Sequence, residues 1–179
     1  FRVRELLVRQ RTQAINALRG HLAEFGAVVP QGAANAARLV ALVEDRGSGL
    51  PDDARGTLQV LVGTLAQLDA QIGKLDKEIA RRAKESDVAR RLMTVPGIGP
   101  LIGTVIAVLA PPPETFRRGR DFAAWLGLVP RQHSTGGKQR LGATTKMGER
   151  SLRRLLIIGA NSVVIKRHVH KEAQPGTWL

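Results

Sequence analysis

The chain has 179 residues, 43% of them apolar, which is enough for one medium domain or two small ones with a buried core. Its formal net charge is +13 and it contains no cysteine, which excludes disulfides, thiolate metal sites and a cysteine nucleophile. So large a positive charge attracts polyanions, and nucleic acid is the leading candidate. The longest apolar run, Leu101 to Leu109, is too short to span a bilayer, so we expect no transmembrane segment and no signal peptide.

The first quarter of the chain predicts a helix and a connector. Residues 3–25 place apolar side chains among arginines and glutamines at helical spacing, and Gly26 is a natural stop. The arginines of this helix either face solvent or touch phosphates, and the pattern favours neither. Glycines and prolines punctuate residues 27–53 around a short helix from about Ala33 to Val43, and we identify no chemistry in this segment.

A narrow apolar stripe follows, and it is typical of a coiled coil. Its members alternate at spacings of three and four: Leu58, Leu61, Leu65, Leu68, Ile72, Leu75 and Ile79. Such a stripe is the seam of a coiled coil rather than the wider face of a helix on a globular core. The partner is either a second copy of the chain, giving a homo-oligomer through the coiled coil, or the first helix folded back antiparallel.

Residues 88–110 predict two short apolar helices separated by a turn, Pro96 to Pro100. The string VPGIGPLIG resembles the helix-hairpin-helix motif of DNA-binding proteins, in which Gly97, Ile98 and Gly99 would approach a phosphate. Glycines allow that approach, and backbone N–H groups at the start of the second helix can bind the phosphate. The alternative is a tight corner between helices, with Gly99 and Gly103 chosen for close packing.

The segment from Arg117 to Arg154 is strongly basic. It carries ten basic residues and two acidic ones, so we expect a phosphate-binding surface. Phe122 and Trp125 share one face of a short helix and are expected in a core rather than stacked on bases. A hairpin or loop rich in glycine follows over residues 131–145, and a final helix starts near Lys146. The candidate contacts to nucleic acid in this segment are Arg117, Arg118, Arg131, Thr135, Lys138, Arg140, Lys146, Arg150, Arg153 and Arg154.

Residues 91–164, and above all the string PRQHSTGGKQRLG, resemble the C-terminal domain of insertion-sequence 110/1111 type transposases, which are bridge-RNA-guided serine recombinases. The first helix resembles the segment after their N-terminal RuvC-like domain. The resemblance implies DNA and a guide RNA as partners, a bacterial cytoplasmic location at the nucleoid, and transposition as the activity. It also implies a serine that attacks a DNA phosphodiester and forms a covalent phosphoserine link.

That serine corresponds to Ser134, in the turn from His133 to Gly137. Nearby cations, Arg131, Lys138 and Arg140, could neutralise the charge that develops on the phosphorus centre. His133 is adjacent, but neighbouring side chains on an extended segment point apart, so we do not favour it as the base. Thr135 is a second hydroxyl in the same loop. Without the resemblance, Ser134 reads as an ordinary turn residue.

We therefore expect a mainly α fold with a linker helix, a long coiled-coil helix, and a small helical domain that contains a helix-hairpin-helix and a Gly-rich basic loop. The parts are residues 1–53, following a missing RuvC-like domain, residues 54–87, the coiled coil, and residues 88–179, a transposase domain cut short after Leu179. No cofactor or metal is expected in this fragment, because the Mg²⁺-binding carboxylates belong to the RuvC-like domain. The fragment should bind nucleic acid but be inactive alone. The alternative is a non-enzymatic helix-hairpin-helix module for nucleic-acid binding and dimerisation.

Overall fold

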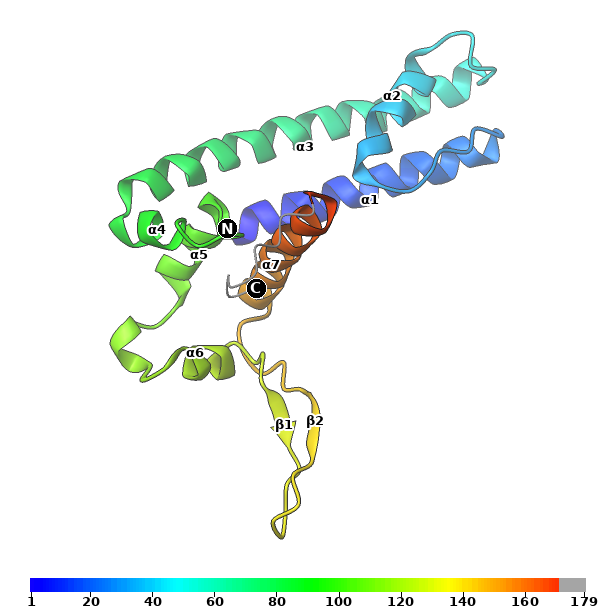
Figure 1. Cartoon of the computed structure of the whole chain (residues 1–179). Helices are drawn as coiled ribbons and strands as arrows, with labels where there is room; N and C mark the ends of the chain where they lie inside the picture. The colour runs from blue at the N-terminus through cyan, green and yellow to red at the C-terminus, as the bar shows by residue number, and fades with distance from the viewer. Residues whose placement is uncertain (171–179) are drawn as a thin grey trace. The chain divides into compact units, whose positions relative to one another are not determined.

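The computed structural model describes residues 1–170 and is mainly helical, as expected (Figure 1). It divides into two compact units, residues 1–78 and the residues from 79 onward. No helix in the described part of the chain is long and apolar enough to cross a membrane. The expected truncation after Leu179 lies outside the described residues.

The first unit pairs two long helices, α1 (Arg2–Glu24) and α3 (Asp52–Glu85), in opposite directions (Figure 1). Arg4 binds Asp76 and Arg11 binds Asp69, each through two nitrogens of the guanidinium. The two arginines lie seven residues apart and so do the two aspartates, in reversed order, so the pairs fix an antiparallel register. Of the two partners that the apolar stripe allowed, α1 of the same chain is the one observed.

A compact apolar core holds the far end of this helix pair together. Its buried side chains come from α1, α3, the short helix α2 (Ala36–Glu44) and two loop residues, Val29 and Leu50. A turn, η1 (Ala33–Asn35), precedes α2. Leu18, Leu22, Leu39 and Val43 are completely inaccessible to solvent. The connector that the sequence left without a role therefore supplies part of the core, because α2 covers apolar faces that a two-helix pair would leave open.

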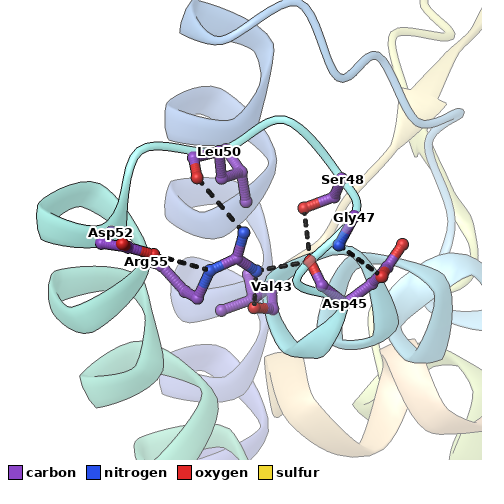
Figure 2. A network of polar contacts seen from close by, with 7 residues as sticks. All are labelled: Val43, Asp45, Gly47, Ser48, Leu50, Asp52 and Arg55. Atoms are coloured by element: carbon purple, nitrogen blue, oxygen red, sulfur yellow. Dashed lines mark hydrogen bonds and ion pairs between the residues drawn. The ribbon is translucent and has the colours of Figure 1, made fainter.

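Arg55 is a buried charged residue of this unit, and its side chain caps the C-terminal end of α2 (Figure 2). The guanidinium of Arg55, whose residue is only 7% exposed, donates from Nη1 to the carbonyls of Val43 at 2.7 Å and Asp45 at 2.5 Å, and from Nη2 to Leu50 at 3.2 Å. The last carbonyls of a helix have no partner within it, so this arginine satisfies them. Arg55 thereby ties α2, the following loop and the start of α3 to one another.

The second unit begins with two short helices, α4 (Asp87–Leu92) and α5 (Pro100–Leu109), joined by a turn as the sequence predicts. Gly97 in that turn has φ +85° and lies against helix α7 (Arg150–His170) at Gly159. A Cβ on Gly97 would come within 2.6 Å of the Gly159 carbonyl oxygen, and one on Gly103 within 3.2 Å of the Ala89 carbonyl oxygen. Two of these glycines therefore serve close packing, whereas Gly99 has open space beside it.

The remaining elements are a turn, η2 (Pro113–Thr115), a short helix, α6 (Gly119–Trp125), and two strands, β1 (Pro130–Gln132) and β2 (Leu141–Thr144). Phe122 and Trp125 stack with ring centroids 5.7 Å apart, and the edge of Phe116 meets Phe122 at 5.3 Å. These rings pack on each other, but all three are half-buried rather than enclosed in a core. The two strands form the hairpin on which the candidate site is built.

Candidate functional site

The glycine-rich segment is a β-hairpin. β1 and β2 pair antiparallel, Pro130 with Thr144 and Gln132 with Leu141, with a bulge between the two pairs. At the tip, Thr135 and Lys138 exchange backbone hydrogen bonds of 3.3 and 3.0 Å around Gly136 and Gly137, whose φ angles are +55° and +75°. A two-residue turn with two positive φ angles matches the twist of a hairpin, and glycine adopts it without strain.

The base of the hairpin is tightly held. A Cβ on Gly127 would lie 2.6 Å from the backbone nitrogen of Met147, and one on Gly148 would lie 2.1 Å from the Trp125 carbonyl oxygen. Arg153 Nη1 on α7 donates to the carbonyls of Leu126 at 2.9 Å and Gly148 at 3.2 Å, one on each side of the hairpin. The segments before and after the hairpin are thus fixed to each other and to α7.

The hairpin itself extends away from this base (Figure 1), and residues 131–140 are all exposed. Ser134 lies just before the tip. Its Oγ accepts a hydrogen bond from the Arg140 backbone N–H at 3.0 Å and donates one to Gln132 Oε1 at 3.3 Å. The serine hydroxyl therefore has a defined orientation although it is open to solvent.

His133 lies on the other face of the hairpin. Its Nε2 is packed against Gly142, where a Cβ would come within 2.7 Å, and the Cβ of Arg131 lies by the same glycine. Arg131 and His133 thus share one face, and Gln132 and Ser134 share the opposite one, as the alternation of side chains along a strand requires. His133 is not among the hydrogen-bond partners of Ser134 in the described structure.

The predicted basic residues fall into two groups. Four lie on the hairpin or just after it, and two follow along the start of α7, all with exposed side chains: Arg131, Lys138, Arg140, Lys146, Arg150 and Arg154. Arg153 is partly buried, and its Nη1 already donates to two carbonyls at the hairpin base. The hairpin thereby brings Ser134 and Thr135 together with three cations on one exposed ribbon.

The second group consists of Arg117 and Arg118, which line an apolar groove of about 640 Å³. Ile98 of the α4–α5 turn, Arg117 and Arg118 are among its lining residues, together with the proline run that ends α5 and the ring of Phe116. Arg118 also begins α6, where its backbone N–H donates to the Asp121 carboxylate at 3.1 Å. The turn glycines Gly97 and Gly99 lie near this region through Ile98, so the predicted contacts form two sites rather than one.

Sequence reasoning did not identify Gln132. Its position two residues before Ser134 on a strand was the available signal, because such residues share a face. Among the described residues, no group of three or more histidines or acidic residues could hold a metal ion.

Known proteins similar to this chain are transposases. Residues 89–174 match the family model described as Transposase IS116/IS110/IS902 family. The chain is 44% identical over 91% of its length to "Probable family 20 transposase" of Pseudomonas aeruginosa, covering 49% of that protein. It is 35% identical over 99% of its length to the transposase for insertion sequence element IS1328 of Yersinia enterocolitica, covering 52% of it, and 34% identical over its whole length to that for IS1111A of Coxiella burnetii, covering 49%. The chain thus spans about half the length of these relatives.

Proposed function

Because the chain belongs to the IS110/IS1111 type of insertion-sequence transposases, we propose that it supplies the serine half of a DNA recombination site, with Ser134 as the nucleophile. One observation carries this proposal. The Ser134 hydroxyl is exposed and oriented by two hydrogen bonds on a hairpin that also carries Arg131, Lys138 and Arg140.

The arrangement suits attack on a phosphodiester. Ser134 Oγ forms a bond to phosphorus, the bond from phosphorus to one sugar oxygen breaks, and that oxygen leaves as a DNA hydroxyl after taking up a proton. A later attack by a DNA hydroxyl reverses the link. Negative charge builds up on the phosphoryl oxygens in the transition state, and positive charge close to them stabilises it. Arg131, Lys138 and Arg140 lie on the His133 face of the hairpin, so they would reach the DNA backbone beside the attacked phosphate. Neither partner of Ser134, an amide oxygen and a backbone N–H, can accept its proton, so a base from elsewhere completes the site.

The whole protein's remaining parts are proposed from the family resemblance. A RuvC-like domain would bring carboxylates and Mg²⁺, and a guide RNA would select the DNA, with the work done at the bacterial nucleoid. Gly97, Ile98 and Gly99, with Arg117 and Arg118, would contact a second stretch of backbone phosphate. A homo-oligomer through the coiled coil also stays a proposal. Since Leu58 and Leu65 of the seam are buried in one core with side chains of α1, a second copy would contact this part of the helix pair from outside.

The test is a covalent adduct. The full-length protein is incubated with a DNA substrate, nicked near the exchange point, that traps the intermediate. We expect Ser134→Ala to bind this DNA with unchanged affinity and to form no adduct, and peptide mapping of the wild-type adduct to place the phosphate on Ser134. Thr135→Val is the matched control for the neighbouring hydroxyl and keeps the adduct. An undiminished adduct in Ser134→Ala would contradict the assignment and favour a binding module.

A further inference from the structure

Gln132 is the feature of the hairpin that the proposed mechanism leaves unused. It is exposed, it lies on the same face as Ser134, and its Oε1 is 3.3 Å from Ser134 Oγ. A serine hydroxyl has one hydrogen and two lone pairs. Here the hydrogen points to Gln132 and one lone pair accepts the Arg140 N–H, so the second lone pair is the one left to attack.

We propose that Gln132 is the positioning residue of the nucleophile: its amide oxygen holds the Ser134 hydroxyl in the orientation from which the remaining lone pair meets phosphorus. This inference rests on the proposed function of Ser134. Gln132 acts through Ser134 and does not touch the DNA or take up a proton. As the bond from Oγ to phosphorus forms, the O–H bond of Ser134 breaks, its hydrogen bond to Gln132 is lost, and the proton passes to the external base.

The backbone of Arg140 completes the arrangement. In a regular antiparallel pair, residues that face each other exchange both N–H···O=C bonds. His133 N–H does donate to the Arg140 carbonyl at 2.8 Å, but the Arg140 N–H donates to Ser134 Oγ instead. The serine oxygen thus takes the place of the His133 carbonyl as the acceptor for the Arg140 N–H. This N–H stays in position to stabilise the serine oxygen as its proton departs.

The same geometry favours Ser134 over Thr135. Thr135 is held by its backbone in the tip turn, through its N–H and C=O to Lys138. Its hydroxyl is not among the side-chain hydrogen bonds of the described hairpin, whereas that of Ser134 has two. The residue with the ordered hydroxyl loses less rotational freedom when it attacks.

The experiment measures the rate of adduct formation at saturating DNA, alongside the DNA dissociation constant, in the full-length protein. Gln132→Ala removes the acceptor, and we expect the rate to fall about tenfold, the effect of one orienting hydrogen bond, at unchanged affinity. Gln132→Met keeps the length of the side chain but has no acceptor oxygen, so its rate should fall as far as that of Gln132→Ala. Gln59→Ala, the same change at an exposed position of α3, is the control and should match the wild type.

The outcomes separate this inference from the proposal it rests on. If Ser134→Ala keeps the adduct, the nucleophile itself is wrong. If Ser134→Ala abolishes the adduct but Gln132→Ala forms it at the wild-type rate, only the role of Gln132 is overturned. A wild-type rate in Gln132→Met would also overturn it, because methionine offers no oxygen acceptor to the serine hydroxyl. A rate loss matched by a loss of affinity would show that Gln132 only supports the hairpin.

Discussion

At the scale of single residues, the second unit depends on a place where only a hydrogen atom fits. Gly159 on α7 packs on the α4–α5 turn so closely that a Cβ would lie 2.3 Å from the Gly97 carbonyl oxygen and 2.9 Å from Ile102 Cδ1. A backbone atom cannot move aside as a flexible side chain can. The contact therefore fixes the distance between α7 and the predicted DNA-binding turn.

We expect Gly159→Ala to lower the free energy of unfolding by about 2 kcal/mol, because the methyl group forces the turn away from α7. Chemical denaturation followed by circular dichroism measures the change. Gly73→Ala is the matched control, since Gly73 also lies within a helix but has open space beside it. There the same substitution should raise the free energy of unfolding by about 0.5–1 kcal/mol, because alanine favours a helix. A neutral Gly159→Ala would show that the α7 contact is loose.

At the scale of elements, α1 and α3 form a helical hairpin closed by the turn structure around Arg55. The sequence predicted the helix α3 well, because helical spacing of apolar residues depends only on local sequence. It could not choose the partner, since a second copy and a folded-back helix satisfy the same stripe. The charged pairs from Arg4 to Asp76 and from Arg11 to Asp69 became evident only once the register was known.

This pairing predicts that the helix hairpin unfolds as a unimolecular unit. Leu65→Ala, which empties a buried position of the seam, should cost about 2–4 kcal/mol of unfolding free energy. The thermal midpoints of the wild type and the variant should not change over a hundredfold range of protein concentration, because an intrachain contact carries no mass-action term. A midpoint that rises with concentration would instead favour a seam between two copies. Val60→Ala, at an exposed position of the same helix, is the control.

At the scale of the whole molecule, the charge is divided unequally. Residues 1–78 carry 10 basic and 9 acidic residues, whereas residues 79–179 carry 18 and 6, so +12 of the net +13 belongs to the second unit. The first unit is close to neutral, and two of its α1 arginines are paired with aspartates. The sequence left the arginines of the first helix between solvent and phosphate, and the structure gives Arg4 and Arg11 a third role, as ion-pair partners of Asp76 and Asp69.

We therefore expect the salt dependence of DNA binding to arise in the second unit. Arg131→Ala and Arg140→Ala should each reduce the slope of log affinity against log salt by about one unit, the value for one lost phosphate contact. Arg38→Ala and Arg46→Ala, at exposed positions of the first unit, should leave the slope unchanged. Titrations at several salt concentrations give the slopes. Equal effects in both units would mean that the charge acts only as a diffuse field.

Most elements could be predicted from the sequence, because helical spacing, prolines and glycines mark them locally. The contacts of Gly97 with Gly159 and of Arg55 with three carbonyls could not, since they join residues far apart or depend on exact turn geometry. Ser134 was identified through the resemblance rather than through its chemistry. Its two hydrogen bonds depend on the register of the hairpin, which the sequence left open between a hairpin and a loop.

The contacts of Arg153 with Leu126 and Gly148 fix the base of the hairpin, so the hairpin acts as a lever arm with Ser134 near its free end. Each strand residue advances the chain by about 3.4 Å, so the serine, which follows Gly127 by seven residues, lies up to about 24 Å beyond the fulcrum at Gly127 and Gly148. A tilt of about 5° at that fulcrum moves the hydroxyl by more than about 1 Å, a displacement that can cost an enzyme about a hundredfold in rate. The position of the proposed nucleophile is therefore set where Arg153 holds Leu126 and Gly148 together, far along the chain from Ser134 itself.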